Sequence, residues 1–196
     1  MKNIYSFICL CLAFWVSSCQ EEPTAASRAA RVKQAYDMEG FLNQEAQALA
    51  KAQPKVTKTV YETGKAKDTK TMSGVDWPSE LAPFSDADLN KPALLGLYTE
   101  EVSTNAAGQT VKRYLAQEDA KTNLKEATYT FDPQGQLVQV DALILQENLM
   151  FKTQKKLHLE VRPNQTPRLH RYRLDETQEL MFMSPDEYGI EGVILP

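Results

Sequence analysis

The hydrophobic pattern divides the chain into an apolar start, a helical segment and a long series of strand-like segments. In the segment that ends at Gln53, apolar residues recur at the 3.6-residue spacing of an amphipathic helix. The residues on this side are Val32, Tyr36, Leu42, Ala46 and Leu49. Thr24 is a candidate N-cap, and Pro54 ends the pattern. Gly40 disfavours a helix by about 1 kcal/mol relative to alanine, so a kink or a later helix start is expected there.

Threonine-rich and alternating segments after the helix predict β-strands. A hairpin is expected over 55–72 with Thr63 and Gly64 in its turn, and short helical turns are expected over 75–92. From Leu95 onward the alternation predicts a meander of consecutive antiparallel strands, with 180–183 and 189–195 as additional edge strands. This order of elements predicts an α+β fold, in which the N-terminal helix and the short helical turns pack on an antiparallel meander sheet.

The first hairpin of the predicted meander has a register that its charges support. A four-residue loop over 105–108 places Val102 opposite Val111 and Glu101 opposite Lys112. Opposite charges that face each other across two strands contribute a few tenths to about 1 kcal/mol. The pairing of hydrophobic and charged residues therefore favours this register.

The apolar start of the chain has the organisation of a secretory signal peptide. Lys2 supplies a positive charge, residues 4–16 form an apolar core, and small residues precede Cys19. The apolar core is too short for a transmembrane helix of about 20 residues. We therefore expect a signal peptide over 1–18, a tether over 19–28 and a single domain over 29–196.

Val16-Ser17-Ser18-Cys19 resembles the lipobox of bacterial lipoproteins. This resemblance covers about twenty residues, and it implies cleavage after Ser18, attachment of diacylglycerol to the thiol of Cys19, and acylation of the new N-terminus by a fatty acid such as palmitate. Gln20 differs from the aspartate that retains such proteins at the inner membrane, so the resemblance implies an outer-membrane location. The acidic pair Glu21-Glu22 is similar to a surface-export signal, and it is equally typical of a solvated linker, so the exposed side of the membrane stays open.

Composition excludes several other classes of protein. The formal net charge of −4 argues against nucleic-acid binding. Two of the three cysteines lie in the expected signal peptide and the third is Cys19, which leaves the mature domain without a disulfide, a thiolate metal site or a cysteine nucleophile.

The chain also lacks recognisable catalytic and metal-binding motifs. No nucleophile elbow, zinc-protease pair or phosphate-binding glycine loop occurs in the sequence. Residues 86–90 imitate the start of a calcium loop, but Lys91 replaces the required glycine and Leu97 the required glutamate. The only histidines, His158 and His170, are expected on opposite faces of the sheet. We expect no cofactor, metal or catalytic residue, and a hydrolase without a recognisable motif is the second alternative.

Basic residues gather on one predicted hairpin between residues 152 and 173. The outward rows of this hairpin contain Lys152, Lys156, His158, Arg171 and Arg173. Like charges on neighbouring strands destabilise a sheet, and a bound anion offsets that repulsion. The candidate partners are an anionic lipid, a glycan or an envelope protein. The alternative is a solvated basic face that Asp141 partly neutralises.

At several positions of the same sheet, a polar residue lies on the row expected to be apolar, or an apolar residue lies on the row expected to be polar. Thr153 and Lys155 lie on the inward row, whereas Leu143, Leu145 and Met150 lie on the outward row. A curved sheet around an apolar cavity explains this exchange, and such an arrangement resembles, in topology only, the half-barrels that carry lipids and lipoproteins in bacterial envelopes. The leading hypothesis is a non-catalytic binding or surface module on a lipid anchor, and a carrier of hydrophobic ligands is the first alternative.

Overall fold

The computed structural model describes residues 35–182 and 184–195. The expected signal peptide, its cleavage site at Ser18, the candidate lipid attachment at Cys19 and the tether lie outside the described residues. In chain order the elements are α2 (Met38–Ala52), β1 (Val56–Glu62), β2 (Lys65–Met72), α3 (Trp77–Leu81), the 3₁₀ helices η1 (Ala82–Ala87) and η2 (Pro92–Leu94), β3 (Tyr98–Thr104), β4 (Thr110–Ala116), β5 (Leu124–Phe131), β6 (Leu137–Glu147), β7 (Phe151–Val161), β8 (Leu169–Leu180) and β9 (Asp186–Ile194).

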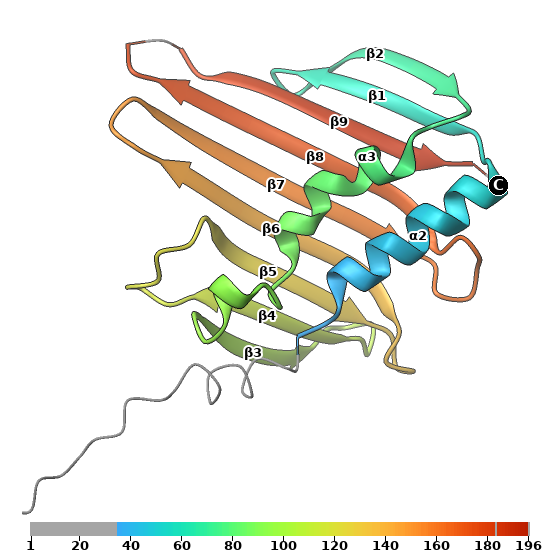
Figure 1. Ribbon diagram of the computed structural model, residues 1–196, viewed down its shortest axis with the longest axis horizontal. Coiled ribbons are helices and arrows are strands. Elements are labelled where there is room, and N and C mark those ends of the chain that lie inside the picture. Colours follow the sequence, from blue (N-terminus) through green and yellow to red (C-terminus); the bar gives the residue numbers. More distant parts are fainter. Residues whose placement is uncertain (1–34, 183, 196) are drawn as a thin grey trace, which may run out of the picture.

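The nine strands form one open antiparallel sheet in the order β2-β1-β9-β8-β7-β6-β5-β4-β3 (Figure 1). The predicted meander is therefore confirmed from β3 to β9. The expectation of edge strands at 180–183 and 189–195 is wrong, because Leu180 ends β8, Met181 and Phe182 lie in a turn, and β9 lies between β8 and β1. The predicted N-terminal hairpin β1–β2 extends the sheet beyond β9, and the edges are β2 and β3. The sheet dominates the fold, and the described residues contain two short α-helices, α2 and α3. The antiparallel sheet of the α+β expectation is confirmed, but the helix content is too small for a clear α+β fold.

The helical segments lie across one face of the sheet, as Figure 1 shows. Alternate residues of the central strands face them, such as Val140 and Ala142 of β6 and Leu157 and Leu159 of β7. Twenty-five buried apolar side chains, all between Met38 and Ile194, form one cluster. The described residues thus contain a hydrophobic core of their own, so we expect the segment 35–196 to fold by itself.

Helix α2 begins at Met38, later than the position of Thr24 suggested. Asp37 is the N-cap, and its Oδ1 accepts a hydrogen bond from the amide of Gly40 at 2.9 Å. A Cβ on Gly40 would lie 2.2 Å from the Asp37 carboxylate, so a larger residue here would require the capping side chain to shift. The helix ends at Gln53, which adopts a left-handed conformation with φ 47° before Pro54.

Two tyrosines of the sheet hold the helical segments in place. The hydroxyl of Tyr129 donates to the carbonyl oxygen of Ala87 at 2.6 Å. The hydroxyl of Tyr172 donates to Glu80 at 2.7 Å, and Glu80 also accepts from Lys58 on β1. The Tyr172 ring lies directly over Gly192, where an added Cβ would be 2.1 Å from a ring carbon. Glycine at 192 is therefore needed for the close approach of this ring.

A buried carboxylate also joins helix α2 to the start of β8. Glu45 is 2 % exposed. Its oxygens accept hydrogen bonds from the backbone amides of Arg168 at 2.7 Å and Leu169 at 2.9 Å, and from the Nε of Arg168 at 2.7 Å. One side chain thus satisfies two backbone donors at the start of β8 and pairs with a cation.

The β3–β4 hairpin has a register one residue away from the prediction. Its loop has five residues, so Thr104 pairs with Thr110, Val102 with Lys112, and Glu101 with Arg113. The Oδ1 of Asn105 accepts from the amides of Ala107 and Gln109, which holds the longer loop. The Glu101–Arg113 ion pair, at 3.6 Å, takes the place of the predicted pair.

Among the described residues, none of the helices is long and apolar enough to cross a bilayer.

Candidate functional site

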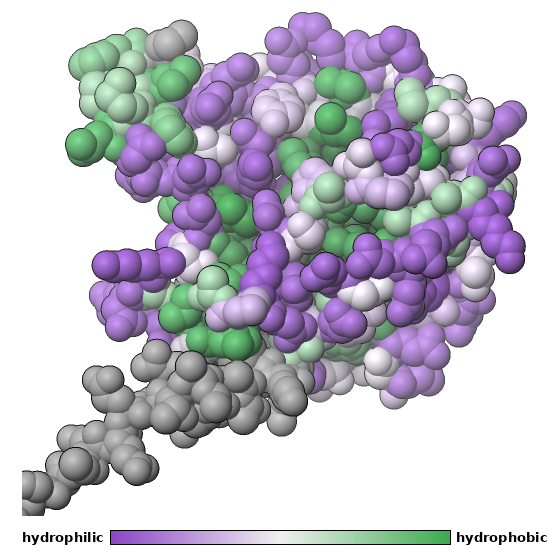
Figure 2. Space-filling view, in the orientation of Figure 1, coloured by the Kyte–Doolittle hydropathy of each residue, from purple (hydrophilic) through white to green (hydrophobic). Residues whose placement is uncertain are grey.

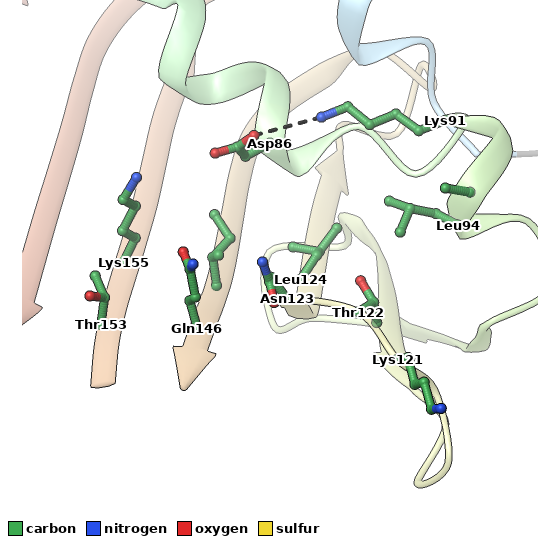
Figure 3. A pocket seen from close by; sticks show the side chains of 12 residues that line it. Asp86, Lys91, Leu94, Lys121, Thr122, Asn123, Leu124, Gln146, Thr153 and Lys155 are labelled. Carbon is green, nitrogen blue, oxygen red and sulfur yellow. Dashed lines mark ion pairs between the residues drawn. The ribbon is translucent and has the colours of Figure 1, made fainter. Parts of the chain in front are cut away.

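A pocket of about 370 Å³ opens on the helix-covered face, at the end of the sheet where β6 ends and β7 begins (Figure 3). Strands β5, β6 and β7 form one side of it. The segment from η1 to η2 and the end of the β4–β5 loop form the other side. Ligand pockets in proteins range from about 300 to 1,000 Å³, so this volume suits a small molecule.

The pocket has an apolar floor and polar walls. The floor includes Leu94, Leu124 and Ile144. The walls contain hydroxyl and amide side chains, namely Thr122, Asn123, Gln146 and Thr153. The predicted inward positions of Thr153 and Lys155 are confirmed by the register, in which Thr153 pairs with Gln146 and Lys155 with Ile144. These two polar residues are the ones that alternation marked as unexpected.

Cations outnumber anions around the pocket. Its lining includes Lys91, Lys121, Lys155 and a single acid, Asp86. The ammonium of Lys91 lies 3.7 Å from Asp86, and that of Lys155 lies 3.8 Å from Glu176. Figure 3 shows Lys91 and Lys155 on either side of Asp86 at one end, with Lys121 at the outer rim. An anionic ligand would therefore share Lys91 with Asp86 and Lys155 with Glu176.

Local structure at two sites forms the pocket. In β5 the register shifts between Leu124 and Glu126, and Lys125 at this bulge donates to the carbonyl oxygen of Thr122 at 2.6 Å. Bulges of this kind redirect side chains next to functional sites. The hydroxyl of Tyr98 donates to the carbonyl oxygen of Leu124 at 2.8 Å and fixes the same turn.

On the other side, the 86–91 segment forms a compact turn. The buried Asp88 accepts from the amide of Asn90 at 3.2 Å, and Asn90 donates to the carbonyl oxygen of Tyr36 at 3.0 Å. Burial raises the pKa of Asp88, while the Asn90 hydrogen bond and Lys91 lower it in part. The acidic residues that imitate a calcium loop are thus used to shape the turn. No cluster of potential metal ligands occurs within 35–182 or 184–195.

The five basic residues singled out by sequence lie on the opposite, uncovered face of the sheet. His158, Arg171 and Arg173 lie side by side on β7 and β8, since His158 pairs with Arg173 and Arg171 with Glu160. Lys156 is one position further on the same row of β7, opposite Asp175. Lys152 lies at the start of β7, between Glu147 and Glu179. The structure therefore brings three of the five together and leaves Lys152 at the strand end.

Carboxylates neutralise both arginines of this face. Arg171 contacts Glu191 at 2.6 Å and Glu160 at 3.5 Å. Arg173 makes two hydrogen bonds to Asp175, at 2.7 and 2.8 Å, and its guanidinium stacks on the ring of Tyr61 with 4.4 Å to the centroid. Within the described part of the chain, neither Lys152 nor Lys156 forms an ion pair. Any anion-binding capacity of this face therefore resides mainly in the two lysines.

His158 is bound by carboxylates at both ring nitrogens. Nδ1 lies 2.7 Å from Asp141, and Nε2 lies 3.2 Å from Glu160. The hydrogen bond with Asp141 raises the pKa of His158 against the opposing effect of burial, and Glu160 adds to the rise. Burial raises the pKa of Asp141, but hydrogen bonds from His158 and Gln139 outweigh it and leave this pKa lowered. With both nitrogens in contact with carboxylates, the His158 ring is a clamp that joins β7 to β6 and leaves neither nitrogen open to a substrate.

This clamp predicts a pH-dependent stability. Because the pKa of His158 is higher in the folded state, its contribution is complete below the unfolded value of about 6.5 and is lost as the pH rises through the folded pKa. Comparing chemical denaturation of the wild type with His158→Gln, we expect an advantage of about 1 kcal/mol at acidic pH that declines toward alkaline pH. His170 is the matched control, because burial and Arg162 lower its pKa. The contribution of His170 to the free energy of unfolding should be lost as the pH falls, so the pH dependence for His170→Gln should be opposite to that for His158→Gln. A pH-independent difference for His158 would contradict the clamp.

Sequence reasoning missed the acidic partners of the basic hairpin. Glu191 was not considered because β9 was placed at an edge, whereas its pairing with β8 sets Glu191 opposite Arg173. The contact of Asp175 with Arg173 could have been predicted, since residues two apart on a strand share a face. Asp141, which the sequence analysis named as partly neutralising this face, contacts His158. His170 leaves the face of Tyr172 because of the bulge between β7 and β8.

The chain was compared with known protein families, curated proteins and solved structures. No protein-family model, no curated protein and no solved structure matches this chain.

Proposed function

We propose that the protein is a non-catalytic ligand-binding module of the bacterial cell envelope, anchored to the outer membrane by a lipid on Cys19. Its pocket between η2 and strands β5 to β7 binds a small amphiphilic anion, with the apolar part on the Leu94, Leu124 and Ile144 floor. The observation that carries this function is the pair of lysines, Lys91 and Lys155, beside an apolar floor on a face that is otherwise packed. The envelope location rests on the lipobox resemblance alone.

The chemistry of the pocket explains the class of ligand. A lysine ammonium donates up to three hydrogen bonds and attracts carboxylate or phosphate, and the amides of Asn123 and Gln146 offer further donors. Leucine and isoleucine on the floor favour an aliphatic group over a fully polar one. A carboxylate or phosphate attached to a short acyl or similar apolar group satisfies both requirements.

A carrier of larger hydrophobic ligands is the second candidate, and one observation favours it. An open sheet with helices over one face is the arrangement expected of a lipid-carrier half-barrel (Figure 1). The space beneath helices α2 and α3 is occupied by core side chains, among them Phe41, Trp77 and Phe84. A long acyl chain would have to displace them, so the end pocket supports a smaller ligand better.

Titration of the segment 35–196 with laurate, followed by displacement of the fluorescent anion 1-anilinonaphthalene-8-sulfonate, tests the pocket. We expect binding in the micromolar range and a loss of about tenfold in Lys155→Gln, because removal of a charge-assisted contact costs about 1.5–3 kcal/mol. Lys156→Gln is the matched control, since the neighbouring residue removes the same charge from the opposite face of β7. Its affinity should stay within about twofold of the wild type.

Three outcomes would contradict this function. Absence of laurate and dye binding at tens of micromolar protein would exclude the amphiphile. An equal loss in Lys155→Gln and Lys156→Gln would indicate general electrostatic attraction and no pocket. A loss confined to Lys156→Gln would move the site to the uncovered face and its basic residues.

A further inference from the structure

Two hairpin turns at one end of the sheet form an exposed apolar knob. The β6–β7 turn contributes Leu149 and Met150, and the β8–β9 turn contributes Leu180, Met181 and Phe182. Leu149 is 89 % exposed and Phe182 is 98 % exposed. Figure 2 shows this knob as a protruding green surface at the upper left, where the two turns of Figure 1 meet. Large apolar side chains gathered in this way mark an interaction site.

The knob behaves as one unit because the two turns are hydrogen-bonded to each other. The amide of Met181 donates to the carbonyl oxygen of Met150 at 3.1 Å. Phe182 has a φ of 69°, a left-handed conformation that is unfavourable for a bulky residue. The exposure of Phe182 is not explained by packing within the described domain, and it points to a contact outside it.

Part of the backbone of the knob is hydrogen-bonded within the chain. The Oδ1 of Asn148 accepts from the amides of Met150 at 2.8 Å and Phe151 at 3.1 Å, and the amide of Asn148 donates to Phe151. With Met181, four amides at the tip have partners within the chain. Such internal hydrogen bonds are needed in the hydrocarbon region of a bilayer, because lipid chains offer no hydrogen-bond partner to an exposed amide.

Charged residues begin one step below the tip. In the strand register Lys152 lies opposite Glu147 on β6 and opposite Glu179 on β8. These three residues form a charged row, the charged rung, across β6, β7 and β8. Leu149 lies two positions beyond Glu147, so the tip reaches at most about 7 Å past the rung. Interfacial membrane anchors insert their apolar side chains by about 5–10 Å, so the rung would lie among lipid headgroups.

We propose that this knob inserts into the interface of a lipid bilayer and holds the domain against the membrane surface. A bilayer fits better than a protein groove for two reasons. The knob is convex, and its side chains are leucine, methionine and phenylalanine, without the tryptophan, tyrosine and arginine that dominate protein interfaces. The acids of the rung outnumber its lysine, so the attraction is apolar and needs no anionic lipid. Insertion depends on neither Cys19 nor the pocket.

Insertion also orients the candidate pocket. Gln146 and Thr153 line the pocket and lie one register step from the charged rung. Figure 2 shows the surface hollowed directly below the knob. In the inserted state the pocket mouth would lie about 10 Å from the buried tips, close to the headgroups.

Position-specific fluorescence tests the insertion. The segment 35–196 contains no cysteine, so Leu149→Cys carries a single environment-sensitive dye, and Ser103→Cys on the distant strand β3 carries the control dye. With phosphatidylcholine vesicles we expect a blue shift and quenching by brominated acyl chains at position 149 only. The double variant Met181→Ser with Phe182→Ser should bind vesicles at least about tenfold more weakly, because it removes two apolar groups from lipid. Circular dichroism verifies that both variants stay folded.

Other outcomes overturn the proposal. Binding that requires anionic phosphatidylglycerol, disappears in 1 M salt and survives in the double variant would assign membrane contact to the basic face. A blue shift without vesicles, together with a molecular mass that rises with concentration, would assign the knob to contact between two copies of the chain. No association of this segment with vesicles at millimolar lipid would exclude insertion of the knob.

Discussion

Replacing residues 1–18 by an ordinary cleavable secretory signal peptide and Cys19 by serine should release the protein from membranes. Each methylene buried in lipid contributes about 0.8 kcal/mol, and two signals suffice for stable anchoring, so loss of the diacylglycerol outweighs every other contact. We expect the native chain in the membrane pellet after a high-salt wash and the exchanged chain in the soluble fraction. Labelling with radioactive palmitate should mark only the native chain.

The design separates the lipid from the leader. A simple Cys19→Ala change leaves the apolar leader uncleaved, and its apolar side chains still favour lipid over water although the leader is shorter than a membrane span. The matched control therefore keeps the ordinary leader and restores Val16-Ser17-Ser18-Cys19 at its end. Recovery of palmitate labelling and of pelleting is expected in this control. An exchanged chain that pellets as the native chain does, or a mature protein whose mass includes Met1, would exclude the lipid anchor.

The anchor and the apolar knob would reinforce each other. Sixteen peptide steps separate Cys19 from Ala35, where the described structure begins, and a fully extended chain of this length reaches about 55 Å. A domain tethered this closely meets the bilayer at a high effective concentration, so even weak insertion of the knob becomes persistent. The exchanged chain should accordingly keep a weak, reversible affinity for vesicles, which the Met181→Ser and Phe182→Ser changes remove.

Local patterns in the sequence predicted most elements of the fold, because each pattern is read within a few residues. The β1–β2 hairpin, the helical turns after Val75 and the strands from Tyr98 to Arg173 all follow from local signals. The pairing of β9 with β1 does not, because residues more than a hundred positions apart meet there and no short-range signal records it. The placement of 189–195 at an edge was wrong for this reason.

The register error has a physical origin that a second loop repeats. Asn105 and Asp132 each accept two loop amides at Oδ1, and Gly108 and Gly135 each adopt a positive φ three residues later. This combination makes a five-residue loop, whereas a search for the shortest loop favours four. An asparagine or aspartate followed three residues later by glycine is therefore the signal for the longer loop.

The candidate pocket was only partly predictable. Thr153 and Lys155 stood out because polar residues on an inward row break the alternation of a half-buried strand. Lys91 and Leu94 reach the pocket from a segment without periodicity, and its position depends on the Asn90 contact with Tyr36. The exposed Leu149 and Phe182 gave no signal, since apolar residues in a predicted strand are normally assigned to a core.

Glu45→Ala should be the most destabilising change in the described domain. The change leaves the amides of Arg168 and Leu169 without an acceptor and leaves the Arg168 guanidinium with only a longer contact, at 3.2 Å, to Gln44. Breaking a buried ion pair by removing one partner costs about 3–5 kcal/mol. Domains are stable by only about 5–15 kcal/mol, so this cost is a large fraction of the total free energy of unfolding. Urea denaturation of the segment 35–196, followed by circular dichroism, measures the difference.

Three further variants separate the contributions of this site. Glu39→Ala removes an exposed acid from the first turn of the same helix and should cost less than about 1 kcal/mol. Glu45→Gln keeps an oxygen acceptor of the same shape and loses the charge, so an intermediate cost of about 1–3 kcal/mol is expected. Arg168→Ala removes the cation while Glu45 still accepts both backbone amides, and it should cost less than Glu45→Ala. If Arg168→Ala and Glu45→Ala cost the same, the ion pair and not the capture of the two amides would join α2 to the sheet. A cost below about 1 kcal/mol for Glu45→Ala would show that neither interaction contributes to stability.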